Sequence, residues 1–235
     1  MLAEGFAEPI EPGVAAGVRE AIGVLQRLGA EVVPISVPAH AQMDAAYAAL
    51  VYEGSKAIHD TGFYGTGAKT HYPASTIVAI DRMWREHADM MQPRAKLNLL
   101  VAALSQRNYH GRAYAKAHNV RPGFIAAFDR VLSEVDALAF PTVRTIAPRF
   151  EPLPSDPAEA VDANLRRNWM LTPMAYNTKP TNYTGHPALA VPCGKVDGMP
   201  ISLQLVGNFM ADSLLLRIAY AYQMAVDWDA HTGVS

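Results

Sequence analysis

The sequence predicts an α/β fold in which long helices cover a sheet of short strands. Two patterns predict this class: apolar residues recur at helical spacing over long segments, and short apolar runs are bounded by proline and glycine. Of the 235 residues, 50% are hydrophobic and 18% are charged, against roughly 25% charged residues in ordinary soluble domains. This composition excludes a disordered chain and supplies a sizeable core.

The first helix is expected to run from Pro12 to Leu28. Pro12 suits the first turn of a helix, and Gly29 follows where a left-handed cap residue belongs. The apolar face of this helix consists of Val14, Val18, Ala21, Ile22, Leu25 and Leu28. The next segment, Glu31–Pro38, predicts a short strand that ends at proline.

The middle of the chain is predicted to be mainly helical. A helix is expected over Ala41–Ile58, a glycine-bearing loop over Thr61–Pro73, and a long helical region over Arg94–Val135. Pro122-Gly123 is expected to kink or split that region, because proline removes a backbone donor and clashes with the preceding turn.

Short strands are predicted towards the C-terminus. Ala137–Phe140 is expected to be a buried strand, and Thr142–Pro157 a surface segment that does not mark a domain boundary. Ala188–Pro192 and Ile201–Val206 are expected to pair as antiparallel strands. Asp197-Gly198 lies between them and supplies residue types that tolerate a positive φ in a hairpin.

The last helix is expected to be capped by the side chain of Asp212. Its apolar face should pack on the sheet formed by the two paired strands. The residues of that face are Leu215, Ile218, Ala219 and Tyr222.

Charge and cysteine content limit the partners and the location. The net charge of −2 provides no basic field, so no nucleic-acid partner is expected. No apolar run approaches the roughly 18 residues of a membrane span, so no membrane partner is expected. The single cysteine, Cys193, excludes an intramolecular disulfide, and the acidic first residues do not resemble a signal peptide. These observations predict a cytoplasmic location.

The residues alone contain no complete catalytic constellation. The eight histidines are scattered, so no metal is expected. Gly65-Thr66-Gly67 has Thr70 in place of the third glycine of a dinucleotide loop, so no other cofactor is expected, and no G-x-S-x-G motif occurs. Cys193 and His186 could form a nucleophilic pair. However, Cys193 ends an apolar strand beside Pro192, and free cysteine is among the most buried residue types, so we expect it in the core.

Several short strings are individually weak signals, but together they are specific in their order and spacing. They are Val18–Val33 with Ser36–Pro38, Tyr109–Ala117, Asp136–Leu138 with Pro141-Thr142, Asn177-Thr178, Thr184–Ala188, Val191–Gly194, Asp197–Pro200 and Leu203–Gly207. In this order they resemble the C-terminal half of the amidase signature family, and they lean toward its aliphatic and aryl amidases. The resemblance extends over nearly the whole chain.

This resemblance implies that residues 1–235 are the C-terminal part of one amidase-signature domain without an internal boundary. The implied fold is an α/β/α arrangement around one mixed sheet. The implied activity is the hydrolysis of carboxylic amides to an acid and ammonia or an amine. In the family a lysine, a cis-configured serine and a nucleophilic serine carry the reaction, and all three belong to an N-terminal half with a Gly-Ser-rich loop.

The sequence departs from the family pattern at this decisive place. It contains neither the Gly-Ser-rich loop nor its lysine, so no catalytic residue carries over and the chain alone is predicted to be inactive. The implied partners are a small amide substrate in the complete enzyme and either a separate N-terminal half or a second copy of the chain.

One turn is singled out as a candidate site. Thr184 and Gly185 follow a polar, proline-bearing segment and precede a buried strand, a position where loops often carry function. By resemblance they are expected to form part of the wall of the substrate pocket. The alternative is a tight turn in which Gly185 is needed only for its backbone angles.

Two other functions stay open at this point. The chain could be a non-catalytic orphan half that acts as a binding or scaffold module. It could also use a new constellation drawn from Ser105, His110 and Lys116, although nothing in their spacing distinguishes them from ordinary surface residues.

Overall fold

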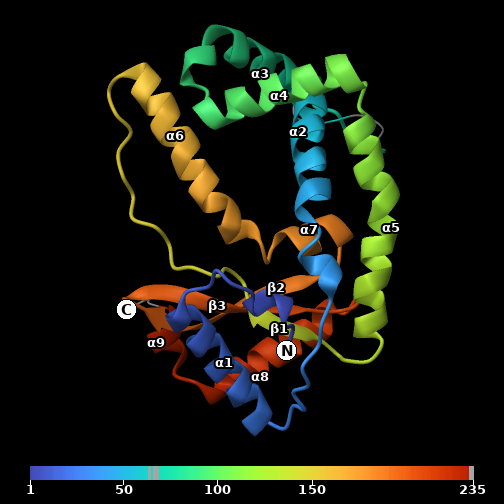
Figure 1. Ribbon diagram of the computed structural model, residues 1–235, viewed down its shortest axis with the longest axis vertical. Coiled ribbons are helices and arrows are strands. Elements are labelled where there is room, and N and C mark those ends of the chain that lie inside the picture. Colours follow the sequence, from blue (N-terminus) through green and yellow to red (C-terminus); the bar gives the residue numbers. More distant parts are fainter. Residues whose placement is uncertain (63–64, 66–68, 233–235) are drawn as a thin grey trace. The chain divides into compact units, whose positions relative to one another are not determined.

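The computed structural model describes residues 1–62, 65 and 69–232, which form two compact units (Figure 1). The first unit comprises Met1–Asp44, Arg121–Phe150 and Leu171–Ser235, and the second comprises Ala45–Val120 and Glu151–Met170. The single domain expected over residues 1–235 stays a prediction. None of the described helices is long and apolar enough to cross a membrane.

The first unit is built on a three-stranded antiparallel sheet. The strands β1 (Leu138–Pro141), β2 (Ala188–Val196) and β3 (Met199–Val206) lie in the order β1-β3-β2. The two predicted C-terminal strands therefore pair as expected, and both are longer than predicted. Asp197 and Gly198 join them with φ angles of 50° and 77°, the pair of left-handed residues that suits a two-residue hairpin turn.

The predicted strand over Glu31–Pro38 is wrong in its extent. Only Ile35 forms a bridge, a parallel one with Leu2, and Ala3 N donates to Ile35 O at 2.8 Å. Pro34 and Pro38 have no backbone N–H, so this segment cannot continue a ladder. Leu2 N also donates to Ala139 O at 3.2 Å, which places Leu2 beside β1. The pairings within the sheet itself are antiparallel, so the mixed sheet implied by the resemblance stays a prediction.

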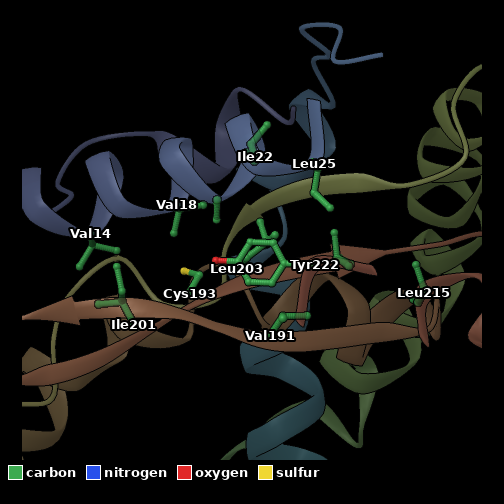
Figure 2. Close-up of a cluster of buried hydrophobic side chains, with 12 residues drawn as sticks. Val14, Val18, Ile22, Leu25, Val191, Cys193, Ile201, Leu203, Leu215 and Tyr222 are labelled. Atoms are coloured by element: carbon green, nitrogen blue, oxygen red, sulfur yellow. The ribbon is translucent and has the colours of Figure 1, made fainter. Parts of the chain in front are cut away.

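The main core of this unit lies between the sheet and two helices (Figures 1 and 2). Helix α1 (Pro12–Arg27) buries the predicted face as far as Leu25, and Gly29 follows it with a φ of 101°. The expectation for Leu28 is wrong, because this residue is the C-cap of the helix and is 50% exposed. Helix α8 (Asp212–Ala225) buries Leu215 and Tyr222, as predicted. The buried cluster consists of Val14, Val18, Ala21, Ile22, Leu25, Val191, Cys193, Ile201, Leu203, Leu205, Leu215 and Tyr222.

The predicted cap of α8 is wrong. The N-cap residue is Ala211, which makes no side-chain cap, and Asp212 is already the first helical residue. The carboxylate of Asp212 therefore lies in the first turn, where a negative charge interacts favourably with the helix dipole.

The second unit is helical in its described part. It contains α2 (Asp44–Asp60), α3 (Ala74–Glu86), α4 (Pro93–Tyr109), the beginning of α5 (Arg112–Leu132) and α6 (Pro157–Leu171). The helix predicted over Ala41–Ile58 is confirmed as α2, with a later start. Residues 63–64 and 66–68 of the predicted loop lie outside the described residues.

The predicted split at Pro122 is wrong, whereas a kink there stays a prediction. Helix α5 continues through Pro122, and the long helical region instead divides at His110 and Gly111, whose φ angles are 53° and 76°. Two successive left-handed residues cannot continue a right-handed helix, whereas one proline costs a hydrogen bond and local crowding.

A buried carboxylate joins three helices of the second unit. Glu53 on α2 is 3% exposed and accepts hydrogen bonds from the hydroxyl of Ser105 on α4 and, at 2.7 Å, from Tyr114 N in the first turn of α5. A carboxylate at this place satisfies one of the backbone donors that the start of a helix leaves open.

Gly5 approaches β1 too closely for any side chain. A Cβ at this position would lie 2.4 Å from Cβ of Phe140, which is fully buried. We therefore expect Gly5→Ala to lower the free energy of unfolding by about 1–3 kcal/mol, as overpacking does in well-packed cores. Urea denaturation measures the effect.

The matched control is Gly123→Ala. Gly123 lies inside α5 and a Cβ there would meet nothing within 4 Å, so alanine should raise stability by up to about 1 kcal/mol. Equal stability of wild type and Gly5→Ala would contradict the close packing of Gly5 on Phe140.

Candidate functional site

The two predicted pocket residues lie where α7 (Lys179–Thr184) ends before β2. Gly185 has a φ of 89°, and its N–H donates to Thr181 O at 2.8 Å, which closes the helix. This left-handed cap favours glycine. A Cβ at Gly185 would still be in ordinary contact, 3.7 Å from Nη2 of Arg121 and from Cε1 of Phe209. Glycine is therefore required at this position for its positive φ and not for lack of space, which fits the tight-turn alternative. The pocket-wall role of Thr184 and Gly185 stays a prediction.

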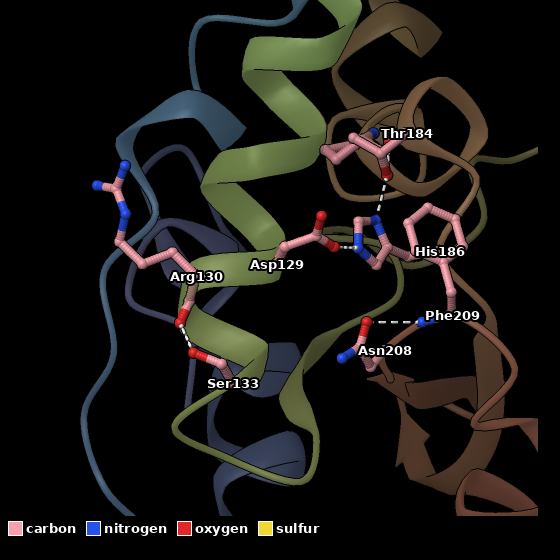
Figure 3. Close-up of polar contacts among 8 residues, drawn as sticks. Asp129, Arg130, Ser133, Thr184, His186, Asn208 and Phe209 are labelled. Carbon is pink, nitrogen blue, oxygen red and sulfur yellow. Dashed lines mark hydrogen bonds and ion pairs between the residues drawn. The ribbon is translucent and has the colours of Figure 1, made fainter.

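Thr184 is held from two sides. Its side chain is buried, and Oγ1 lies 3.0 Å from Pro180 O and 2.8 Å from Nδ1 of His186 (Figure 3). The hydroxyl donates to Pro180 O, and which atom donates in its contact with Nδ1 of His186 depends on the tautomer of the ring. In either arrangement the side chain of Thr184 is fixed.

His186 connects this turn to α5. Its side chain is fully buried, and Nε2 lies 3.0 Å from Oδ1 of Asp129 (Figure 3). The imidazole stacks on Phe209 at 4.4 Å between ring centroids and lies 5.6 Å from the ring of Phe128. Two hydrogen bonds and two aromatic neighbours therefore lock the ring.

The order hydroxyl, imidazole and carboxylate is also that of a nucleophilic triad. Thr184 cannot act as its nucleophile, because only 1% of the residue is exposed and a carbonyl carbon must approach the attacking oxygen. What the arrangement does is fix the turn that ends at Gly185.

The hypothesis of a Cys193–His186 pair is not supported by the structure. Cys193 is buried in the core cluster, and burial raises the pKa of its thiol to about 12. His186 instead contacts Thr184 and Asp129. The expectation that Cys193 is a core residue is confirmed.

The alternative constellation of Ser105, His110 and Lys116 has no support either. The hydroxyl of Ser105 donates to Glu53, His110 is an exposed cap at the end of α4, and Lys116 is exposed on α5. Within the described ranges, no group of three or more His, Cys, Asp or Glu residues could hold a metal ion.

A second polar cluster lies at the end of β1. The side chain of Asn177 is fully buried, and its Nδ2 donates to Gly5 O at 2.9 Å and to Pro141 O at 2.6 Å. Its Oδ1 lies 3.1 Å from Nε2 of His40. Gln204 on β3 donates to Asn177 O at 3.1 Å, from the face of the sheet opposite to Leu203 and Leu205. We refer to Asn177, His40 and Gln204 as the Asn177 cluster.

Sequence reasoning missed two residues beside the candidate turn. Asp129 binds His186 across 57 positions, and Arg121 lies next to Gly185. Both residues lie on α5. The apolar stripe of this helix predicts which face is buried, but it does not predict which polar residues of the helix contact a distant segment. Asn177 did stand in one of the family-like strings, without an assigned role.

A family model described as Amidase matches residues 2–216 of the chain. The chain is 32% identical over 233 residues to a glutamyl-tRNA(Gln) amidotransferase subunit from Picosynechococcus, covering 97% of this chain and 45% of that protein. It is 32% identical over 225 residues to the corresponding subunit from Chloroflexus aggregans, covering 96% of this chain and 43% of that protein.

Two solved structures share the fold. One is a bacterial aryl acylamidase of the amidase signature family, with a TM-score of 0.68, 20% identity and coverage of 98% of this chain and 44% of that one. The other is 6-aminohexanoate cyclic dimer hydrolase, with a TM-score of 0.70, 22% identity and coverage of 97% and 44%. The chain spans less than half the length of these relatives.

Proposed function

The chain belongs to the amidase family, and on this premise we propose that it is the C-terminal portion of an enzyme that hydrolyses carboxylic amides. The products would be a carboxylic acid and ammonia or an amine. The observation that carries the proposal is the match over residues 2–216, together with relatives that align along 97% of this chain but only 45% of their own length. The proposal treats residues 1–235 as part of one domain of that enzyme.

The proposed mechanism is that of a Ser–cis-Ser–Lys triad on another segment. Amide cleavage needs a nucleophile activated by a base and donors placed at the developing oxyanion. The buried hydroxyl of Thr184 and the protonated thiol of Cys193 do not meet the first requirement, which supports a nucleophile from elsewhere. The partner would be a polypeptide with the N-terminal half of the fold.

This portion would contribute the wall of the acyl pocket at Thr184 and Gly185. The turn is suited to that role because His186 and Asp129 fix Thr184, and a wall must be rigid to discriminate between substrates. Phe209, which is 45% exposed, adds an apolar surface beside Gly185. Mixing the chain with the N-terminal half of a family member and measuring amide hydrolysis tests the proposed function.

The pocket role makes a prediction about selectivity in such a mixture. Thr184 is buried behind the exposed Gly185, so its side chain would set the position of the wall. Thr184→Ala should let the turn move inward and Thr184→Leu should push it outward, so the two variants should shift the ratio of kcat/KM for benzamide and acetamide in opposite directions. One methylene in an apolar pocket changes such ratios by about 10-fold or more. Steady-state kinetics with both amides measure the ratio.

The control is Thr184→Val, which keeps the shape of the side chain and loses its hydroxyl. It should preserve the selectivity even where stability falls. An unchanged ratio in folded Thr184→Ala, verified by circular dichroism, would count against the pocket wall and favour the tight-turn alternative.

A further inference from the structure

An unusual set of unpartnered polar atoms lies just after β1 and in the neighbouring Asn177 cluster. Within the described part of the chain, Nε of Arg144, Oγ1 of Thr142 and Nδ1 of His40 are buried and have no hydrogen-bond partner. Nearly all buried polar groups in folded proteins are paired with protein or ordered water. Three such atoms in one region therefore need an explanation.

Arg144 is the most demanding of the three. The residue is 5% exposed, and a guanidinium keeps its charge and offers five N–H donors. Its contacts are a hydrogen bond from Nη1 to Ala7 O at 2.9 Å and a stack on the ring of Tyr176, 3.8 Å from Cζ to the centroid. Neither contact is an ion pair, and a buried charge without a counter-charge is strongly unfavourable.

The acidic side chains that influence Arg144 are engaged elsewhere. Burial lowers the pKa of Arg144, and the charges of Asp44 and Glu8 oppose this shift in part. However, Asp44 forms an ion pair with Nζ of Lys179 at 2.7 Å, and Oε2 of Glu8 accepts from Ile10 N at 2.9 Å. Among the described residues, no carboxylate is within ion-pair distance of Arg144.

The unpartnered atoms differ in what they can bind. Nε–H of Arg144 is a donor and the hydroxyl of Thr142 can donate, so both require an acceptor. His40 is different: because Nδ2 of Asn177 donates to two carbonyls, Oδ1 of Asn177 faces Nε2 of His40, which must carry the ring proton. Burial also lowers the pKa of His40. Nδ1 of His40 therefore carries no proton and can only accept a hydrogen bond, so it cannot bind an anion.

The segments around Arg144 could admit a small group. Residues 7–11 and 145–150 contain neither helix nor strand in their described backbone. Irregular segments open at lower free energy than the elements they connect. A ligand that reaches Arg144 past them must be small.

We propose that Arg144 and Thr142 bind a carboxylate group at the end of β1. A carboxylate supplies the missing negative charge and can accept from both donors, a geometry to which guanidinium is well matched. The same chemistry could come from a free small carboxylate or from an acidic side chain of a complementing polypeptide. The proposal does not depend on amide hydrolysis.

The first experiment uses the chain by itself. The midpoint of thermal unfolding is measured in sodium formate and in sodium chloride at equal concentration, so that ionic strength is matched. For a free carboxylate, the wild-type midpoint should rise with formate and saturate, and Arg144→Gln should remove the rise. Arg144→Lys, which keeps the charge without Nε–H, should respond to formate at least threefold more weakly.

The matched control is Arg19→Gln. Arg19 is exposed and also stacks on an aromatic ring, 4.8 Å from the centroid of Phe6, so it tests whether any stacked arginine gives the response. This variant should keep the full wild-type rise. If Arg144→Gln does not fold, the comparison of Arg144→Lys with Arg19→Gln still decides the result.

The second experiment distinguishes the source of the carboxylate. The affinity of the chain for the N-terminal half of a family member is measured by calorimetry, without any turnover. A loss of tenfold or more in Arg144→Gln or Arg144→Lys but not in Arg19→Gln, together with no response to formate, assigns the carboxylate to an acidic side chain. Equal midpoints in formate and chloride and equal affinities in all variants would overturn the proposal, whether or not the mixture hydrolyses amides.

Discussion

The isolated chain is expected to hydrolyse no amide, and activity is expected only when an N-terminal half is added. The proposed nucleophile, its base and the oxyanion donors would all come from that half. Loss of a complete triad lowers kcat by about 10⁶-fold and leaves only catalysis by the oxyanion hole and binding, and here the hole would also be absent. Release of ammonia from acetamide and benzamide, and of the chromophore from an anilide, measures the effect.

A fluorophosphonate probe serves as the control for this experiment, because it labels activated serines. In the active mixture it should label the N-terminal half and leave this chain unlabelled. Turnover by the isolated chain, with labelling of one of its own serines, would refute the proposal that the catalytic residues lie on the N-terminal half. An inactive mixture of two halves that bind each other would favour a binding or scaffold module.

Asn177→Ala is expected to lower the stability of the first unit strongly. It would leave Gly5 O, Pro141 O and Nε2 of His40 buried without their present partner. Each unsatisfied buried group costs about 1–3 kcal/mol, so a loss of at least about 3 kcal/mol is expected. The shift of the urea midpoint at constant slope measures it.

Asn208→Ala is the matched control for this substitution. Asn208 is exposed, and its Oδ1 accepts from the neighbouring Phe209 N at 2.8 Å. Surface substitutions of this kind usually change stability by about 0.5 kcal/mol or less. Similar midpoints for the two variants would mean that Asn177 does not organise the end of β1.

The elements predicted correctly from the sequence are those whose signals are local. The hairpin follows from Asp197-Gly198 between two apolar runs, and α1 follows from its stripe between Pro12 and Gly29. The position of the helix break was predicted wrongly for two reasons. His110 adopts a left-handed conformation, which a histidine in a sequence does not predict. Pro122 is a strong helix-breaking signal, yet helix α5 continues through it.

The helices α3 and α6 were not predicted. Helix α3 nevertheless has an apolar stripe, because Ile77, Ile80 and Trp84 recur at helical spacing and are its half-buried residues. This local signal was present in the sequence and could have identified the helix.

Only half of the candidate site could be predicted from the sequence. The turn at Thr184 and Gly185 was identified, and the structure places it at a helix end before a buried strand. Its supports were not identified, because Asp129 and Arg121 lie on a helix that is distant in sequence. A polar contact between distant segments depends on the fold, and a local pattern does not encode it.

Because Cys193 is buried, the rate at which its thiol reacts can be used to measure how often the core opens. The chain has a single thiol, which lies in the cluster between α1 and the sheet (Figure 2). With a pKa raised to about 12, this thiol is almost entirely protonated at neutral pH and is shielded from reagents while the core is closed. A thiol reagent therefore modifies the protein mainly through states in which the packing around Cys193 has loosened. The modification rate, divided by that of an unfolded peptide, gives the population of those states without any engineered label.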